Sequence, residues 1–481
     1  MFVRSQHIHF IGIGGIGMSG IAEILLNMGF PVSGSDLRRS GITDRLTVLG
    51  ATIYEGHAAA HITGADVVVT TSALSEKNPE VVAARERHIP IIQRAEMLAE
   101  LMRLKYGVAV AGMHGKTTTT SMIAAVLAAG DLDPTVVVGG RVDAMGSNAR
   151  LGSSEYLVAE ADESDRSFLM LSPILTVVTN LDREHMDCYR DMADIEDAFV
   201  EFMDKVPFYG ASTVCVDDPM LAAILPRVRR RIHTYGMSPE AEFRLQPLPR
   251  AENPRSKNSP SGLAHFHVIH AGATLGPFTL HVPGAHNLRN ATAAVAIGLQ
   301  LGISAEKIAA GLDSFRGVDR RFQPRGAVGG VTVVDDYGHH PTEIRATLAA
   351  ARECGFRSIR VLFQPHRYSR TRDLLDAFRD CFEDADQVSI LDIYAASEEP
   401  IPGVHAPALV AAIGRSLERN AGRKPVQYAA SFQEAVQQAV ETAEPGDLIL
   451  TLGAGNIQQA VPMVLEALEK RALPVSTLRG K

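Results

Sequence analysis

Short apolar runs alternate along the chain with stretches of helical spacing. The run His7–Ile11 ends in glycines, and Gly17–Met28 then places apolar residues three and four positions apart. A short apolar run predicts a buried strand, and a period near 3.6 predicts an amphipathic helix. Further strands are predicted at 31–35, 65–71 and 89–92. The alternation predicts a parallel sheet covered by helices, in a first domain at residues 1–105.

A second strand–helix series follows. Tyr106–Ala111 predicts a strand that leads through a Gly-Lys-Thr loop into a helix at 118–129. The polar stretch 247–262 predicts an exposed hairpin tip. The other elements predicted in this second domain, at residues 106–318, are strands at 156–159, 175–179, 213–216, 265–270 and 278–282 and a helix at 286–301.

A third unit begins near Asp319 and is assigned to residues 319–481. Its predicted strands are Val331–Asp335, Ser358–Phe363, Gln387–Leu391 and Asp447–Leu452, with helices between them. At roughly 100–200 residues per domain, a chain of this length holds about three domains. The predicted fold class is therefore α/β, with three domains.

Composition excludes some partners. Net charge is -8, so no general basic field is available to bind nucleic acid or an anionic membrane. No apolar run reaches the ~18 residues that span a bilayer. The 4 cysteines form no Cys-x-x-Cys pair, and the first residues enter a strand pattern without a signal peptide. We therefore expect reduced thiols, no disulfides and a cytoplasmic protein.

A glycine-rich turn, Gly12-Ile-Gly14-Gly-Ile-Gly17, follows the first strand and opens the first helix, and Asp36 ends the next strand. In such a turn the first glycine allows the tight bend, the second lets backbone approach a diphosphate, and the third permits close packing of helix and strand. The pattern predicts a diphosphate cradle and leaves its nucleotide open: a nicotinamide or flavin dinucleotide, or a nucleotide-sugar. A glycine turn without a ligand is the alternative.

A second loop, Gly112-Met-His-Gly115-Lys116-Thr117-Thr118, departs from the strict P-loop spacing, because Val110 stands where the first glycine belongs. Its context, with an apolar strand before and a helix after, is that of a phosphate loop. Lys116 would reach the β and γ phosphates of ATP, and the Thr117 hydroxyl would bind Mg²⁺. An ordinary strand–helix turn that contains lysine is the alternative.

Acids and a histidine follow two later strands. The segment Glu160–Asp165 contains 4 acids, and His185 lies in a polar stretch after the next strand. Mg²⁺ prefers hard oxygen ligands, and a neutral imidazole also binds metal. We therefore expect a metal site near the phosphates. A solvated acidic turn is the alternative, and it suits Asp165 better than Glu160.

Three more polar clusters stand at helix starts or strand ends. Asn290 could bind a purine edge, although an N-capping role for Asn287 is equally consistent with the pattern. The stretches 335–343 and 364–372 follow apolar strands, and the arginines of the second suit carboxylate or phosphate contacts. Ligands bind at the carboxyl ends of strands in open α/β sheets, which favours a binding site over a salt-bridged surface turn.

Taken in order, these motifs resemble those of the Mur ligases of peptidoglycan synthesis, over nearly the whole chain. The resemblance rests on the stretches Ile11–Gly20, Gly112–Thr119, Glu160–Asp165, Asp335–Glu343 and Gln364–Arg372. It implies a Rossmann-like N-terminal domain for a UDP-sugar, a central P-loop ATPase-like domain, and a Rossmann-like C-terminal ligase domain that closes over the site. The Gly12–Gly17 loop would then hold the UDP diphosphate and not NAD.

The resemblance also assigns roles to residues. For the UDP-sugar it implies Gly12, Gly14, Gly15, Gly17, Asp36, His57 and Ser72. For ATP it implies Gly112, Met113, His114, Gly115, Lys116, Thr117, Thr118, His286, Asn290, Arg321 and Asp336. The implied Mg²⁺ ligands are Thr117, Glu160 and His185, and the implied catalytic residues are Lys116, His339, Arg367 and Arg370.

One departure from the pattern of the family indicates which of its branches this chain resembles. Many relatives carry a carbamylated lysine about fifteen residues after the histidine equivalent to His185, whereas this chain has no lysine until Lys205. That agrees with the branch that adds L-alanine to the lactyl carboxylate of UDP-N-acetylmuramate, using ATP, through an acyl phosphate. The insert at 253–260 looks specific to this chain and receives no role.

Three alternatives stay open. A recycling ligase of the same family attaches a preformed tripeptide to the same UDP-sugar, and Tyr337 favours the alanine enzyme over it. A nicotinamide-dependent oxidoreductase would use the first glycine loop but leaves the Gly-Lys-Thr loop unexplained. A non-catalytic UDP-sugar or ATP sensor would not need the set Lys116, Thr117, Glu160 and His185. We expect a monomer or a weak homodimer.

Overall fold

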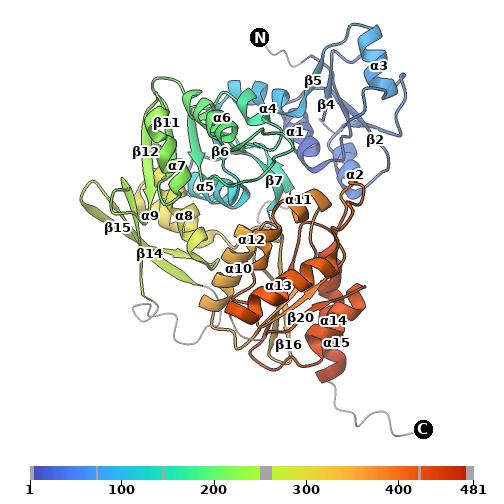
Figure 1. Cartoon of the computed structure of the whole chain (residues 1–481). Helices are drawn as coiled ribbons and strands as arrows, with labels where there is room; N and C mark the ends of the chain where they lie inside the picture. The colour runs from blue at the N-terminus through green and yellow to red at the C-terminus, as the bar shows by residue number, and fades with distance from the viewer. Residues whose placement is uncertain (1–4, 72–73, 143–146, 250–262, 421–423, 473–481) are drawn as a thin grey trace. The chain divides into compact units, whose positions relative to one another are not determined.

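The computed structural model describes residues 5–71, 74–142, 147–249, 263–420 and 424–472. Within them the chain forms three β-sheets with helices between the strands (Figure 1), which confirms the predicted α/β class. Two compact units are present. One contains the first two sheets and the other contains the third. The predicted domain junctions near residues 105 and 318 stay predictions.

The first sheet is parallel throughout and has five strands in the order β3-β2-β1-β4-β5. This is the order expected when each strand is followed by a crossover helix. The strands are β1 (Ile8–Ile11), β2 (Val32–Asp36), β3 (Thr52–Glu55), β4 (Val67–Thr70) and β5 (Ile91–Gln93). The helices are α1 (Ile16–Asn27), α2 (Gly41–Val48), α3 (Pro79–Glu86) and α4 (Arg94–Arg103).

The second sheet has ten strands in the order β15-β14-β13-β12-β11-β10-β6-β9-β7-β8. Its parallel centre comprises β6 (Tyr106–Ala111), β7 (Thr135–Val142), β9 (Tyr156–Glu160), β10 (Leu175–Val178), β11 (Ala211–Cys215), β12 (Ile232–Gly236) and β13 (Phe243–Pro247). The remaining strands are β8 (Ser147–Arg150), β14 (Ala264–His270) and β15 (Ala273–Leu280). The helices of this stretch of chain are α5 (Lys116–Ala129), α6 (Met192–Asp204), α7 (Pro219–Ile224), α8 (Ala285–Gln300) and α9 (Ala305–Ser314).

The third sheet has six strands in the order β16-β17-β21-β18-β19-β20, with only β16 antiparallel to its neighbour. The strands are β16 (Gln323–Val328), β17 (Val331–Asp336), β18 (Ile359–Phe363), β19 (Gln387–Ile390), β20 (Val426–Tyr428) and β21 (Leu448–Leu452). The helices are α10 (Pro341–Glu353), α11 (Tyr368–Asp373), α12 (Leu375–Arg379), α13 (Ala406–Asn420), α14 (Phe432–Val440) and α15 (Ala460–Ala472).

Two apolar cores cover the two faces of the third sheet. Side chains of α10, α12 and α13, including Ile344, Phe378 and Ile413, fill one face. Side chains of α14 and α15, including Val436 and Val464, fill the other. Parallel sheets are buried on both faces, which explains why their strands are continuous apolar runs.

Two predicted boundaries were wrong. The helix predicted at 118–129 begins at Lys116, so the lysine and Thr117 are its first residues. The strand predicted at 278–282 is β15, which begins at Ala273 and contains Gly276–Pro277, so these two residues hid the strand pattern. The predicted hairpin tip at 247–262 joins the antiparallel strands β13 and β14, although residues 250–262, with the insert at 253–260, lie outside the described part.

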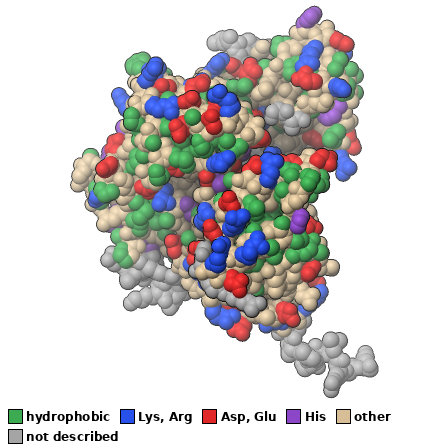
Figure 2. Space-filling model, viewed as in Figure 1, with side chains coloured by type: hydrophobic (Ala, Val, Ile, Leu, Met, Phe, Trp, Pro, Cys, Tyr) green, Lys and Arg blue, Asp and Glu red, His purple; other side chains and the backbone are tan. Residues whose placement is uncertain are grey.

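Among the described residues, none of the helices is both long enough and apolar enough to cross a bilayer. On the face drawn in Figure 2, acidic and basic side chains are interspersed.

Candidate active site

The phosphate loop connects β6 to α5 and requires glycine at both of its ends. Gly112 has a φ of +125°, and a Cβ there would overlap the Thr179 hydroxyl. Gly115 has a φ of +84°, and a Cβ there would lie 2.9 Å from Asn290 Oδ1. Both dihedrals fall in the region that favours glycine. The positive φ angles and the close contacts with Thr179 and Asn290 therefore require glycine at both positions.

The end of β10 holds this loop in place. The Thr179 hydroxyl donates to the His114 carbonyl at 2.7 Å, and the His114 amide donates to Asn180 Oδ1 at 2.8 Å. Strands β6 and β10 are neighbours with Ala111 opposite Val178. The carboxyl ends of these two strands are therefore neighbours. The residues that follow them come together, as expected at the carboxyl ends of strands in an open α/β sheet.

Lys116 and Thr117, the first residues of α5, contact acids that follow β9. Lys116 Nζ donates to Glu163 Oε1 at 2.7 Å, and the Thr117 hydroxyl donates to Glu160 Oε2 at 2.9 Å. Burial works to lower the pKa of Lys116, but Glu163, Glu160 and Asp162 outweigh it and raise that pKa above its usual value. Lys116 is therefore a cation at neutral pH and suits a phosphate.

Of the three proposed metal ligands, two contact each other and the third lies beside another carboxylate, that of Glu163. Thr117 pairs with Glu160, and His185 Nε2 lies 3.4 Å from Glu163 Oε1. His185 also has a φ of +57°, a strained conformation for histidine and one often found at functional sites. Hydroxyl and carboxylate oxygens at a strand end fit a hard cation such as Mg²⁺. The prediction of these ligands did not include Glu163, although it lies in the same acidic segment.

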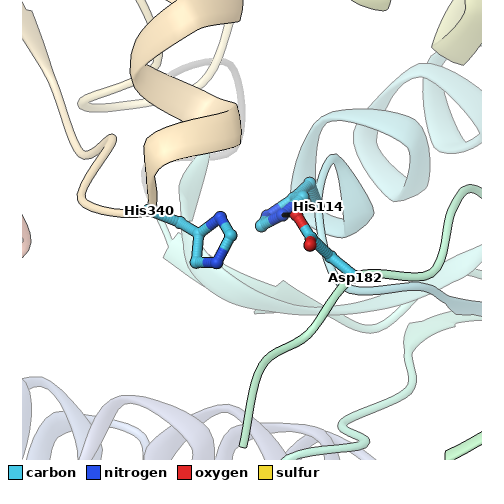
Figure 3. Close-up of side chains that lie close together, drawn as sticks. All are labelled: His114, Asp182 and His340. Carbon is cyan, nitrogen blue, oxygen red and sulfur yellow. Dashed lines mark hydrogen bonds and ion pairs between the residues drawn. The ribbon is translucent and has the colours of Figure 1, made fainter. Parts of the chain in front are cut away.

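His114 has a fixed side chain within the loop. Its Nε2 lies 2.9 Å from Asp182 Oδ2, and Figure 3 shows the imidazole beside that carboxylate. Asp182 follows β10, so the carboxylate reaches the loop from the neighbouring strand end. The contact orients the ring, while the His114 amide stays bonded to Asn180 Oδ1.

The first turns of α8 contain the two residues predicted to contact adenine. His286 and Asn290 stand four positions apart and so share one helix face. Asn290 lies against Gly115 of the phosphate loop. The alternative role for Asn287 was wrong, because α8 already begins at Ala285 and the Asn287 amide donates to the Pro283 carbonyl at 2.7 Å.

The first glycine loop closes around Asp36. Gly12 has a φ of +78°, and the Gly14 amide donates to Asp36 Oδ2 at 2.9 Å. A Cβ on Gly14 would lie 2.9 Å from that same oxygen, and a Cβ on Gly15 would lie 3.3 Å from the Gly12 carbonyl. A Cβ on Gly17 would meet the Arg94 side chain, so the third glycine accommodates an arginine of α4 and not the expected strand contact.

His57 is held by a carboxylate that the sequence did not single out. Glu80 is fully buried, and its Oε2 lies 3.1 Å from His57 Nδ1 and accepts from the Ser35 hydroxyl at 2.6 Å. His61 Nδ1 lies 2.9 Å from the other oxygen. Ser72, predicted for the same site, lies outside the described residues.

In the C-terminal unit, Asp336 and Arg321 are both held by local contacts. Asp336 accepts from the amides of Phe322 at 2.6 Å and Gly338 at 2.7 Å, and burial raises its pKa. The Arg321 guanidinium lies 5.1 Å from the centre of the Tyr337 ring and 3.5 Å from Glu343 Oε1. Asp336 therefore shapes the turn after β17, and Arg321 supplies positive charge beside it.

Three of the remaining predicted residues surround His366. The rings of His339 and His366 lie 5.7 Å apart, and Arg370 Nη1 lies 3.1 Å from His366 Nδ1. Burial, His339 and Arg370 lower the pKa of His366 to about 4, so its ring is neutral and accepts from the arginine. Arg367 has a φ of +69° and donates its amide to the Tyr394 carbonyl at 2.8 Å. His366 is a member of this cluster that was not predicted.

Three family models match the chain in succession. The model described as "Mur ligase family, catalytic domain" matches residues 7–106. The "Mur ligase middle domain" matches residues 110–298, and the "Mur ligase, glutamate ligase domain" matches residues 320–455.

Known proteins are similar to this chain over nearly its full length. A protein of Acidobacterium capsulatum named UDP-N-acetylmuramate–L-alanine ligase is 66% identical over 98% of this chain and 99% of its own length. One of the same name from Koribacter versatilis is 62% identical over the same shares. The crystal structure of UDP-N-acetylmuramate-alanine ligase from Thermotoga maritima is similar with a TM-score of 0.75 and 28% identity, over 97% of this chain and 99% of that one.

Proposed function

Because the chain belongs to the Mur ligase family, we propose that it is the ATP-dependent ligase that joins L-alanine to the lactyl carboxylate of UDP-N-acetylmuramate, for peptidoglycan precursor synthesis. The observation that carries the chemistry is the Gly-Lys-Thr loop, in which Lys116 lies among acids at the strand ends. The choice of substrates rests on the names of relatives that are 66% and 62% identical.

The reaction has two steps. The lactyl carboxylate attacks the γ-phosphorus of ATP, which gives an acyl phosphate and releases ADP. The α-amine of L-alanine then attacks the activated carbonyl carbon, and the tetrahedral intermediate collapses to an amide and inorganic phosphate. A free carboxylate is a poor acyl donor, so ATP supplies the activation. The chain's contribution is positioning and charge neutralisation.

We assign the roles of the chain's residues accordingly. Lys116, with the Gly112–Thr118 loop and the N-terminus of α5, holds the β and γ phosphates, and Asn290 with His286 holds the adenine. Thr117, Glu160 and His185 hold Mg²⁺, which when bound neutralises the charge on the transferred phosphoryl group. The Gly12–Gly17 loop holds the diphosphate of the UDP-sugar, with Asp36 and His57 at the same site.

The C-terminal unit contributes the other proposed residues. Arg321 and Asp336 serve the nucleotide, and Arg367 and Arg370 offer guanidinium groups to the amino-acid carboxylate or the transferred phosphate. His339 is the candidate base for the amine proton. Its Nδ1 lies 3.3 Å from Glu343 Oε2, so a carboxylate is in place to stabilise the ring once it is protonated.

The proposal is tested by phosphate release. The protein is mixed with Mg-ATP, UDP-N-acetylmuramate and single amino acids, and released phosphate is measured. We expect release that depends on L-alanine and on the UDP-sugar together. Release that no amino acid stimulates would remove the assignment. Preference for a preformed tripeptide over L-alanine would indicate the recycling ligase. A change in NADH fluorescence on binding to the protein would favour the oxidoreductase.

Assembly and location complete the proposal. We infer a monomer or a weak homodimer that acts in the cytoplasm, where ATP and reduced thiols are available. Light scattering at several concentrations measures the assembly, and cell fractionation measures the location.

A further inference from the structure

Lys116 uses every hydrogen of its ammonium group within the chain. Nζ donates to the carbonyl oxygens of Gly112 at 2.8 Å and Met113 at 3.2 Å, and to Glu163 Oε1 at 2.7 Å. An ammonium group has three donors, so none is left for a phosphate. A nucleotide that binds Lys116 must therefore displace or share one of these contacts.

Glu163 is the charged partner among the three. Its side chain is fully buried, and its Oε2 has no hydrogen-bond partner among the described residues. Its Oε1 faces both Lys116 Nζ and His185 Nε2, the latter at 3.4 Å. A buried carboxylate needs a compensating charge, and in this arrangement the Lys116 ammonium is the closest one.

Phosphate binding changes this balance. A nucleotide phosphate brings negative charge to Lys116 beside the carboxylate that Lys116 already neutralises. The ammonium is then shared between two anions, and Glu163 keeps a buried negative charge that is only partly compensated. Its free oxygen faces no donor among the residues described, so a divalent cation is the chemistry that restores the balance.

We propose that Glu163 is a positioning residue that exchanges counter-ions. Its carboxylate pairs with the Lys116 ammonium while the phosphate loop is empty, and it pairs with a divalent cation when a phosphate binds Lys116. Glu163 thereby couples nucleotide affinity to the cation, beside the proposed cation ligands Thr117, Glu160 and His185. The inference rests on the proposed function only in that a nucleotide occupies the Gly112–Thr118 loop. It does not depend on which carboxylate or amine is joined.

The main test compares ADP binding with and without Mg²⁺. Isothermal titration calorimetry on the full chain gives the dissociation constant for ADP with Mg²⁺ and with EDTA, and their ratio measures the coupling. In Glu163→Gln we expect ADP to bind more tightly than in the wild type in EDTA, because a negative charge beside the phosphate is gone. The coupling ratio should fall by about tenfold, a difference of about 1.4 kcal/mol.

Asp165→Asn is the matched control. Asp165 lies in the same acidic segment, is exposed, and accepts from the Ser167 amide at 3.0 Å. The substitution removes the same charge from the segment, and its coupling ratio should stay near the wild-type value. An unchanged ratio in Glu163→Gln, or an equal fall in both variants, would overturn the proposal.

A second measurement starts from Lys116→Ala and does not depend on the single variant Glu163→Gln. In Lys116→Ala the carboxylate loses its ammonium, so Mg²⁺ alone, without nucleotide, should raise the melting temperature more than it does in the wild type. Lys116→Ala combined with Glu163→Gln should lose this extra shift. Equal Mg²⁺ shifts in Lys116→Ala and the wild type would contradict the exchange.

The outcomes also separate this inference from the proposed function. If ADP coupling depends on Glu163 but no amino acid stimulates phosphate release, the ligase assignment falls and the exchange stands. If phosphate release depends on L-alanine but the coupling ratio ignores Glu163, the exchange falls and the ligase stands.

Discussion

Among single residues, Glu80 illustrates how a buried charge orders the side chains around it. Burial alone raises the pKa of its carboxyl, but the His9, Ser35 and His61 side chains outweigh burial and lower that pKa from 4.5 to about 2. Glu80 is therefore ionised at neutral pH. It fixes the ring of His57 through Nδ1, which leaves Nε2 of that ring for other partners.

Glu80→Gln should lower the stability of the full chain by about 2–3 kcal/mol at pH 7, because an amide has one acceptor oxygen where the carboxylate accepts at both. A carboxyl whose pKa is depressed in the folded state adds stability above its unfolded pKa of about 4.5 and loses it as pH falls toward about 2. Urea unfolding from pH 7 down to the lowest pH at which the chain folds should therefore show the gap between the two proteins closing below about pH 4.5. A gap that stays constant over that range would contradict the ionised state of Glu80.

Lys116→Ala should reduce phosphate release by at least about 100-fold, because it removes a cation that acts on the charge of the transferred phosphoryl group. Affinity for UDP-N-acetylmuramate should change by less than about threefold, since the proposed sugar site is built on a different sheet. Lys105→Ala is the control: Lys105 donates to the Ser154 carbonyl at 2.6 Å and should keep its turnover. Retained turnover in Lys116→Ala would remove the role assigned to this lysine.

The sequence singled out those candidate site residues that stand in a local pattern. Lys116 and Thr117 were predicted from a strand, a loop and a helix that are contiguous. Glu163 and Glu80 were not, because their partners lie 47 and 23 positions away, and His366 was not, because its ring contact with His339 arises only in the fold. Spacing in the sequence places residues at a strand end, but it does not select which carboxylate pairs with which cation.

At the scale of elements, glycine has opposite effects in a loop and in a helix. Gly112 sits between β6 and α5 at a φ of +125°, where a Cβ would overlap Thr179. Gly414 lies inside α13 with nothing within 4 Å of its ideal Cβ. Glycine in a helix costs stability relative to alanine because the unfolded chain loses more freedom on folding.

Gly112→Ala should therefore destabilise the chain by about 1–3 kcal/mol, whereas Gly414→Ala should stabilise it by about 0.5–1 kcal/mol. Urea unfolding of each variant against the wild type measures both changes. The paired design controls for the methyl group itself, which is the same in both substitutions. A loss of stability in Gly414→Ala comparable to that of Gly112→Ala would show that local conformation does not decide the sign.

Some central, apolar strands were predicted with nearly the observed bounds. Tyr106–Ala111 was predicted with both of its ends, and Leu175–Val178 within one residue. The strands at sheet edges β3 (Thr52–Glu55), β8, β16 and β20 were not predicted, and neither were the interior strands β7, β12 and β13. Apart from β7, in which two glycines follow Val136–Val138, these strands lack a continuous apolar run, so edge position alone does not explain why they were missed.

On the scale of the whole molecule, the third sheet has both of its faces covered by helices from its own unit. Among the described residues, its two cores draw on side chains between Phe322 and Leu468. A domain of about 150 residues buries enough surface to fold alone. We therefore predict that a fragment of residues 319–481 folds without the rest of the chain and unfolds in urea in one cooperative transition.

Unfolding in the presence of nucleotide should distinguish the two units. The Gly112–Thr118 loop belongs to the other unit, so Mg-ADP should leave the unfolding curve of the fragment unchanged. In the full chain, Mg-ADP at about 100 times its dissociation constant should add about 2.7 kcal/mol to the transition of the unit that contains the loop. Lys116→Ala should lose most of that increment. If the fragment lacks cooperative unfolding, or if Mg-ADP stabilises it, then the sheet that follows residue 318 depends on the rest of the chain for its fold, or the nucleotide site does not reside on the Gly-Lys-Thr loop.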